Sequence, residues 1–167
     1  MEENFILFGC GNMGLKHLTK LLDSYENSKF LICEPNFHAH EIYGHPAITV
    51  ATDIEEFSDL FESIDNYIIA SPSQYHLELL KRVLRKDVKI LIEKPVGTNA
   101  LSRTDLLIAA SRASCKVTAG FIERYSAAAF LLAHIFKSQK ISELVMTRES
   151  HACPSDIDVV EDLMIHD

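Results

Sequence analysis

A glycine motif near the N-terminus constrains the fold of this 167-residue chain more than any other feature. The motif has the spacing G-x-G-x-x-G and lies between an apolar run, Phe5–Phe8, and a segment with leucines at helical spacing. In this context the first glycine permits a tight turn, the second lets the backbone approach a pyrophosphate, and the third lets the helix pack on the strand. Amides at the start of the helix then face the anion. The motif predicts a dinucleotide site formed by Gly9, Cys10, Gly11, Asn12, Met13 and Gly14.

An acidic residue narrows the identity of the dinucleotide. Glu34 lies twenty residues after Gly14 and directly follows Phe30–Cys33, the second expected strand. A carboxylate at that position can accept hydrogen bonds from both hydroxyls of the adenosine ribose, and it repels a 2′-phosphate. We therefore expect NAD to bind in preference to NADP. The alternative is a glycine turn that holds no ligand.

Short β-branched or aromatic runs alternate with helical patterns up to Gly120. This alternation is typical of repeated βα units around a parallel sheet, so the expected fold class is α/β with a doubly wound parallel sheet of six strands. Asp53 and Glu56 have the spacing of a capping box, which predicts a helix after Asp53. The expected strands are Phe5–Phe8, Phe30–Cys33, Ile48–Val50, Tyr67–Ala70, Val88–Ile92 and Lys116–Gly120. The other expected helices are Met13–Asp23, Gln74–Arg85 and Asn99–Ala113.

The remaining residues read differently. They predict a helix over Ser126–Phe136, a strand over Glu143–Glu149 and a helix over Ile157–Asp167. So few elements cannot close a sheet, which indicates the truncated start of a second, α+β domain. We expect a boundary near Gly120, with residues 1–120 binding NAD and residues 121–167 opening the second domain.

Composition excludes several classes of protein. Sixteen Lys and Arg against 24 Asp and Glu give a net charge of −8, which argues against a nucleic-acid partner. The four cysteines form no Cys-x-x-Cys pair, which fits a reducing compartment. The N-terminus lacks the basic start of a signal peptide, and the most apolar stretch, Ala127–Phe136, is too short to span a bilayer. We therefore expect a cytoplasmic protein with no membrane partner.

Ligands in open parallel sheets bind beyond the carboxyl ends of the strands, so residues after the fourth and fifth strands matter most. These include Ser71, Pro72 and His76, and then Glu93 and Lys94. At this point the sequence resembles the family of glucose-fructose oxidoreductase, inositol dehydrogenase and MocA-like nicotinamide oxidoreductases, which have a Rossmann domain. The matching pieces, in the family's order, are Gly9–Gly14, Ser71-Pro72 with His76, Glu93-Lys94-Pro95, Gly120–Tyr125 and Asp162–Asp167.

The resemblance implies roles for individual residues. In the family the lysine of Glu-Lys-Pro lies beside the nicotinamide, and the histidine of Asp-x-x-x-His is the acid/base, which makes Lys94, Asp162 and His166 the expected catalytic residues. Hydride removal from a carbinol carbon needs such a base, and positive potential near the oxygen. Asp162 is four residues before His166, so its carboxylate can orient the imidazole. The resemblance adds Ser71, Pro72, His76, Glu93 and Lys94 to the expected NAD-binding residues.

Within the family, the segments Gly120–Tyr125 and Pro154–Asp167 are most similar to members acting on nucleotide-linked amino sugars, especially UDP-N-acetylglucosamine 3-dehydrogenases. This resemblance places Arg124 and Tyr125 at the substrate, with Lys94 and His166. Those members carry Arg-Phe-Asn-Pro where this chain has Arg124-Tyr125-Ser126-Ala127, so another sugar or a cyclitol is the alternative.

The family's second domain forms one wall of the substrate pocket, commonly mediates oligomerisation, and continues well past the histidine motif. We therefore expect a homo-oligomer when the protein is full length, and a 167-residue chain that is itself inactive because it is truncated. A function from another class, a degenerate or non-catalytic fragment that only holds NAD, stays open.

Simpler interpretations of these residues exist. Lys94 could be a solvated strand-end lysine, His76 a polar residue on a helix surface, and Asp162 with His166 an ordinary surface pair. Tyr25 and Lys29 have the Tyr-x-x-x-Lys spacing of short-chain dehydrogenases, but they lie in a polar loop and the match is treated as chance. No metal is expected, because neither of two further groups has the spacing of a ligand set. These groups are His38, His40 and His45, and His151 with Cys153.

Overall fold

The computed structural model describes residues 3–36, 41–85, 87–97, 100–138, 140, 142–143 and 145. The chain divides into two compact units, Met1–Ala119 and Gly120–Asp167, which are described separately. The site residues that precede Gly120 all belong to the first unit.

The first unit is built on a six-stranded sheet in the order β3-β2-β1-β4-β5-β6. The strands are β1 (Phe5–Phe8), β2 (Phe30–Cys33), β3 (Ile48–Ala51), β4 (Asn66–Ile69), β5 (Lys89–Ile92) and β6 (Lys116–Ala119). All neighbouring strands are parallel and end level with one another, because the last residue of each strand pairs with the last residue of the next. This is the doubly wound topology, with its change of direction between β1 and β4, and it confirms the predicted fold class.

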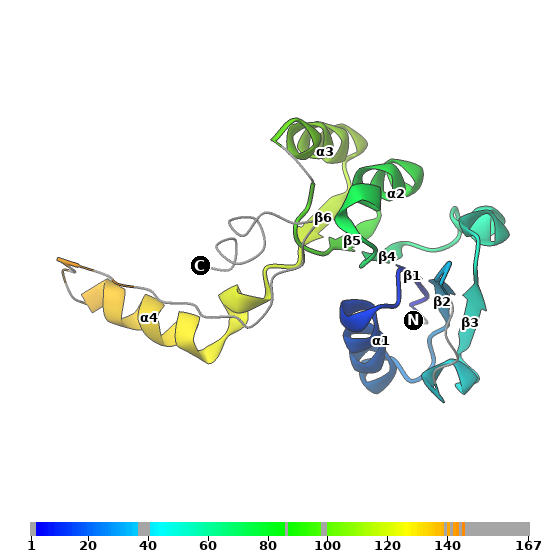
Figure 1. Ribbon diagram of the computed structural model, residues 1–167, viewed down its shortest axis with the longest axis horizontal. Helices are drawn as coiled ribbons and strands as arrows, with labels where there is room; N and C mark the ends of the chain where they lie inside the picture. Colours follow the sequence, from blue (N-terminus) through cyan, green and yellow to red (C-terminus); the bar gives the residue numbers. More distant parts are fainter. Residues whose placement is uncertain are drawn as a thin grey trace. The chain divides into compact units, whose positions relative to one another are not determined.

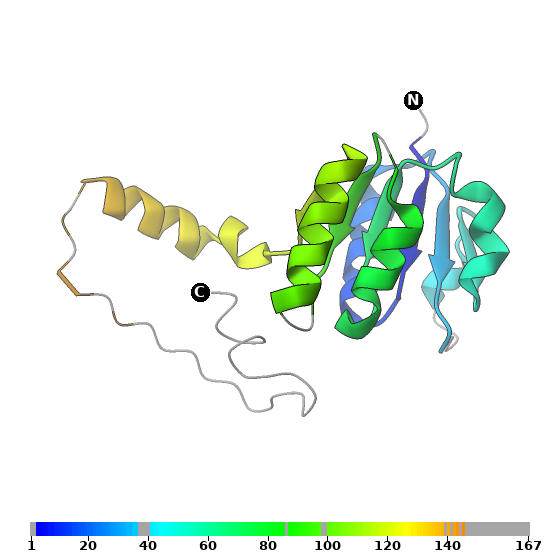
Figure 2. The same ribbon diagram turned by 90° about the horizontal axis from the view of Figure 1, so that it is seen from above.

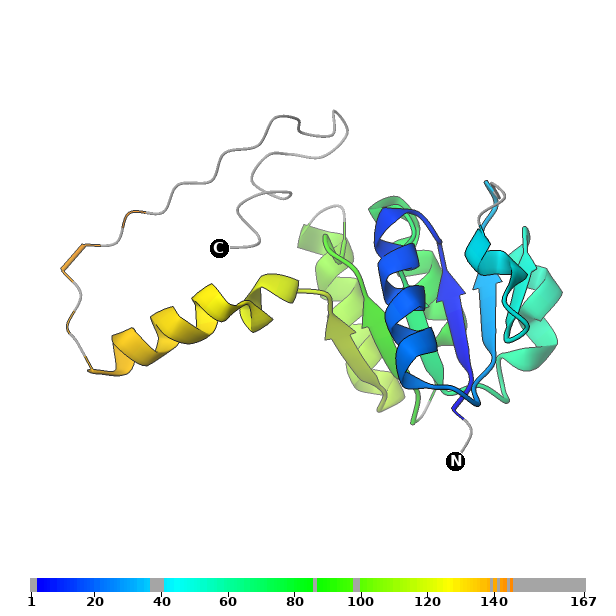
Figure 3. The ribbon, with the colours of Figure 1, turned by 90° about the horizontal axis from the view of Figure 1, so that it is seen from below.

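Helices cover both faces of this sheet. Helix α1 (Asn12–Ser24) lies on one face, and α2 (His76–Val83) and α3 (Ala100–Ala113) lie on the other, as Figures 1, 2 and 3 show. Short 3₁₀ segments complete the connections: η1 (Glu41–Gly44), η2 (Ile54–Leu60) and η3 (Ser73–Tyr75). The helix predicted over Gln74–Arg85 is shorter than expected, because η3 replaces its first turn and α2 ends at Val83.

The capping box at the start of η2 is confirmed. The Asp53 carboxylate accepts a hydrogen bond from the Glu55 amide at 3.0 Å, and the Glu56 carboxylate accepts one from the Asp53 amide at 3.1 Å. The segment that follows is a 3₁₀ helix and not an α-helix.

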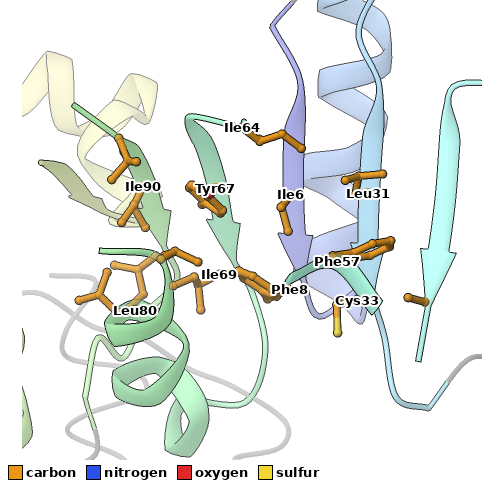
Figure 4. Packing of buried hydrophobic residues seen from close by; sticks show 14 of the residues in the cluster. Ile6, Phe8, Leu31, Cys33, Phe57, Ile64, Tyr67, Ile69, Leu80 and Ile90 are labelled. Carbon is orange, nitrogen blue, oxygen red and sulfur yellow. The ribbon is translucent and has the colours of Figure 1, made fainter. Parts of the chain in front are cut away.

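Alternating side chains of the central strands supply two apolar layers. Phe5 and Leu7 of β1 belong to a cluster with Leu18 of α1, whereas Ile6 and Phe8 point to the opposite face. Figure 4 shows the second cluster, in which Phe8, Tyr67, Ile69 and Leu80 pack between the sheet and α2. Because both faces are buried, the strands read as continuous apolar runs.

The second unit is described only in part. It contains η4 (Ile122–Tyr125) and α4 (Ala127–Ser138), and α4 exposes Phe130 and Leu131. The predicted helix Ile157–Asp167, and most of the predicted strand Glu143–Glu149, lie outside the described residues. Within the described part of the chain, no helix is both long and apolar enough to cross a membrane.

Candidate functional site

The glycine motif forms the turn from β1 into α1, and two of its glycines are required by geometry. Gly9 has a φ of +84°, and a Cβ there would lie 2.6 Å from Cα and N of Ser71. A Cβ on Gly14 would lie 2.2 Å from the carbonyl oxygen of Gly9. The turn is therefore packed against the loop after β4, and side chains at Gly9 and Gly14 cannot be added without moving the backbone.

Gly11 has a different environment. A Cβ there would meet no atom of the described chain within 4 Å, so this part of the backbone faces open space. Gly11 is also the N-cap of α1, where no side chain caps the helix and no acidic residue occupies the first turn. Amides in the first turn of a helix lack intrahelical partners, and with the helix dipole they favour an anion. These residues fit a pyrophosphate.

Glu34 follows β2 and is held by two backbone amides. Its Oε2 accepts a hydrogen bond from Cys10 N at 2.7 Å, and its Oε1 accepts one from Asn36 N at 2.9 Å. Each carboxylate oxygen keeps a further lone pair for another donor. The carboxylate is thus oriented beside the glycine motif and can still accept ribose hydroxyls.

A cavity of about 430 Å³ adjoins Glu34 at the carboxyl ends of β1 to β4. Ser71 and Pro72 line it, and the Ser71 hydroxyl is buried with no hydrogen-bond partner among the described residues. The remaining lining residues are Phe8, Gly9, Cys33, Glu34, Pro35, Asn36, Thr52, Asp53, Ile54, Tyr75, Glu78, Leu79 and Arg82. This is the position at which open α/β sheets bind ligands, and the cavity and the acid fit the adenosine half of a dinucleotide.

The motif cysteine does not add charge to this site. Burial raises the pKa of the Cys10 thiol, while the hydrogen bond with Tyr43 lowers it by less. The thiol therefore stays neutral near pH 7, and it adds no negative charge beside the helix amides.

His76, predicted at the cofactor, is a buried link between two loops. It is 1% exposed, with Nε2 2.8 Å from the Ser71 carbonyl oxygen and Nδ1 3.0 Å from that of Pro95. Burial lowers the pKa of His76, although the bonds to the two carbonyl groups act in the opposite direction. A neutral imidazole donates to only one of these oxygens at a time. The interpretation of His76 as a surface residue is wrong.

Glu93 and Lys94 follow β5 at the same edge of the sheet. Glu93 is 5% exposed, and its Oε1 lies 2.6 Å from Nε2 of His17 in α1, while its Oε2 accepts a bond from Lys94 N at 3.2 Å. Burial acts to raise the pKa of Glu93, but the hydrogen bonds and charges of His17 and Lys94 together outweigh burial, and the net pKa lies below its usual value. Glu93 is therefore a buried carboxylate. Lys94 is half-buried, and its peptide bond to Pro95 is cis.

Sequence reasoning missed His17. The available signal was a histidine three residues after Gly14 and next to Leu18, which is fully buried, in an otherwise amphipathic helix. Nothing in that pattern identifies Glu93 as its partner, because the two residues are 76 positions apart.

The structure brings together the expected residues of the first unit at the carboxyl edge of the sheet. Arg124 and Tyr125 lie in η4, and Asp162 and His166 lie outside the described residues.

No group of three or more His, Cys, Asp or Glu side chains that could hold a metal occurs in the described part of the chain. Of the histidines considered as ligands, His45 is exposed, and His38, His40 and His151 lie outside the described residues, as does Cys153. Tyr25 caps the end of α1 and Lys29 precedes β2, at the edge opposite the site.

The class of protein follows from comparison with known families. Residues 4–121 match the sequence profile of an oxidoreductase family with an NAD-binding Rossmann fold. This is the family of glucose-fructose oxidoreductase, inositol dehydrogenase and MocA. The chain belongs to this family. The predicted family and the predicted cofactor, NAD, are confirmed.

The individual relatives share only a low sequence identity with this chain. The chain is similar to an inositol 2-dehydrogenase from Pseudarthrobacter chlorophenolicus, with 27% identity over 89% of this chain and 45% of the relative. It is also similar to the solved structure of scyllo-inositol dehydrogenase from Lactobacillus casei with NAD(H) and scyllo-inositol. The TM-score is 0.69 and the identity 20%, over 86% of this chain and 43% of that chain. The solved WlbA dehydrogenase from Bordetella pertussis with NADH and UDP-GlcNAcA gives a TM-score of 0.68 and 18% identity, over 81% of this chain and 40% of that chain. The chain spans about half the length of the curated relatives it matches.

Proposed function

We propose that this protein is an NAD-dependent dehydrogenase that moves a hydride between the nicotinamide ring and a carbinol carbon in the ring of a sugar or cyclitol. One observation carries the proposal: the open backbone at Gly11, the oriented Glu34 carboxylate and Lys94 lie at the carboxyl edge of a single sheet. In the order of the strands β2, β1 and β5 across the sheet, the first unit thus offers groups for the adenosine ribose, the pyrophosphate and the reacting end of NAD. NAD, when bound, supplies the hydride acceptor.

Each residue has a defined task in this proposal. The amides after Gly11 hold the pyrophosphate, Glu34 accepts the ribose hydroxyls, and Ser71 and Pro72 border the adenosine cavity. Lys94 supplies positive potential near the substrate oxygen as it becomes a carbonyl. His166, oriented by Asp162, takes the hydroxyl proton as the carbinol C–H bond gives up its hydride.

The substrate is proposed at the level of its class. A nucleotide-linked amino sugar such as UDP-N-acetylglucosamine finds support in the fold likeness to a dehydrogenase solved with UDP-GlcNAcA. The cyclitol alternative finds support in relatives named inositol 2-dehydrogenase. Arg124 and Tyr125 are the proposed substrate contacts, in a second domain over residues 121–167 that also carries the oligomer interface.

Turnover tests the proposal. The full-length protein is incubated with NAD and either myo-inositol or UDP-N-acetylglucosamine, and NADH formation is followed by absorbance, with Lys94→Ala as the matched variant. We expect NADH from one of the two substrates, and a turnover rate reduced by about 10²–10³ in the variant. Binding of NADH without turnover of either substrate would favour the non-catalytic NAD-binding alternative. Equal turnover by Lys94→Ala would contradict the role of Lys94.

A further inference from the structure

The short segment around Lys94 is held at both of its flanking residues. Glu93, before it, contacts His17 through its carboxylate, and Pro95, after it, contacts His76 through its carbonyl oxygen. His17 belongs to α1 and His76 to α2, so the two histidines reach this segment from opposite faces of the sheet (Figures 1, 2 and 3). The backbone at Lys94 is therefore held on both sides of the residue.

The contact from α1 is the closer of the two and involves a charge. His17 Nε2 and Glu93 Oε1 are 2.6 Å apart, and their side chains are only 19% and 7% exposed. The other carboxylate oxygen of Glu93 accepts a hydrogen bond from the amide of Lys94 itself. A single carboxylate thus joins the imidazole of His17 to the backbone of Lys94.

This contact also connects two parts of the NAD site. Helix α1 begins at the glycine motif, so His17 is on the helix whose first amides face the pyrophosphate. The Glu93 carboxylate lies beyond β5, on the far side of β4 from β1. The pair therefore fixes the distance between the pyrophosphate-binding turn and the lysine.

We infer that His17 is a positioning residue, which acts through the Glu93 carboxylate to place Lys94 relative to the bound dinucleotide, with His76 holding the opposite side of the same turn. The inference rests on the proposed function, because it assigns a purpose to the placement of Lys94. This role requires no contact between His17 and the amine of Lys94. It acts on the geometry of the Glu93–Pro95 turn.

The test follows the Lys94 amine directly in the unliganded chain. Lysine amines are labelled by reductive ¹³C-methylation, and the Lys94 resonance is assigned by its disappearance in Lys94→Arg. His17→Gln keeps a donor near the position of Nε2, whereas His17→Leu removes the donor and His17→Asn draws it back from the carboxylate. Lys16→Gln, at an exposed neighbouring position of α1, is the matched control.

We expect the Lys94 resonance to keep its position in His17→Gln and Lys16→Gln, and to move toward the exposed lysines in His17→Leu and His17→Asn. The Lys89 resonance should stay unchanged in all four variants. A Lys94 resonance that keeps its original position in a folded His17→Leu or His17→Asn chain overturns the inference. Loss of the fold in both variants also overturns it, because His17 would then support the whole unit and not this turn.

A second measurement separates this inference from the proposed function. NADH is added to the unsubstituted chain and to each variant, and the shift of the Lys94 resonance is recorded. We expect the same shift in the unsubstituted chain and His17→Gln, and a smaller shift in His17→Leu. Failure of NADH to bind the unsubstituted chain would contradict the proposed function, while the comparison without cofactor would still decide the role of His17.

Discussion

Two glycines of the motif give a matched pair of alanine substitutions with opposite expected effects. Gly9→Ala places a methyl group 2.6 Å from backbone atoms of Ser71, at a residue with a φ of +84°. The left-handed conformation costs a non-glycine residue about 1–2 kcal/mol, and forced overpacking costs about 1–3 kcal/mol. We therefore expect Gly9→Ala to lower the free energy of unfolding by about 2–5 kcal/mol, a large part of the total for a domain of this size.

Gly11→Ala is the control for that change. Its methyl group meets no atom within 4 Å, and alanine at an N-cap costs about 1 kcal/mol or less relative to glycine. The methyl group does occupy the space through which a pyrophosphate approaches the helix amides. Loss of one hydrogen bond to a charged group is worth about 1.5–3 kcal/mol, so NADH affinity should fall about 10–100-fold.

Urea unfolding followed by circular dichroism, with NADH titration by fluorescence, measures both quantities on the same proteins. The reasoning is refuted if Gly9→Ala is as stable as the unsubstituted chain, or if Gly11→Ala binds NADH with unchanged affinity. A Gly11→Ala variant that is less stable than Gly9→Ala would reverse the assignment of the packed and open glycines.

Three further outcomes are expected. Leu80→Ala removes a fully buried side chain of α2 and should lower the free energy of unfolding by about 2–5 kcal/mol in urea, whereas truncation of the exposed Leu131 should change it little. Asp53→Ala removes the cap of η2 and should cost about 0.5–2 kcal/mol, measured by thermal unfolding; an unchanged melting temperature would contradict the role of the cap. The folded-state pKa of Glu93 lies below its unfolded value of 4.5, so its stabilising contribution is present above pH 4.5 and is lost as the pH falls through the lower folded value. The difference in unfolding free energy between the unsubstituted chain and Glu93→Gln should therefore shrink on acidification below pH 4.5. A difference that stays constant with pH would refute the lowered pKa of Glu93.

The central strands of the sheet could be predicted closely because β1, β2 and β4 are buried on both faces. Phe5–Phe8 and Phe30–Cys33 form strands over the predicted residues, since continuous apolar runs bounded by polar residues leave little choice of boundary. The start of α2 differs from the prediction, because Ser73–Tyr75 forms a 3₁₀ turn where the sequence pattern predicts a first α-helical turn.

The site residues also differ in how far the sequence predicts them, because some features depend on neighbouring residues and others on contacts between distant segments. The place of the glycine turn after β1 and the place of Glu34 directly after β2 depend on short stretches of chain next to single strands, and sequence spacing predicts such features. The contact between His17 and Glu93, and the carbonyl partners of His76, depend on which loops the folded sheet places side by side. No local pattern encodes those partners, so His17 was missed and the burial of His76 was left open.

The preference between NADH and NADPH tests the central claim most directly. The unsubstituted chain and Glu34→Ser are titrated with both dinucleotides, and four dissociation constants are compared. We predict that the unsubstituted chain binds NADH more tightly, and that Glu34→Ser loses about 10–100-fold in NADH affinity while NADPH affinity falls much less, because the serine no longer accepts both ribose hydroxyls or repels a 2′-phosphate. Tighter binding of NADPH by the unsubstituted chain, or no change of preference in Glu34→Ser, would contradict the account.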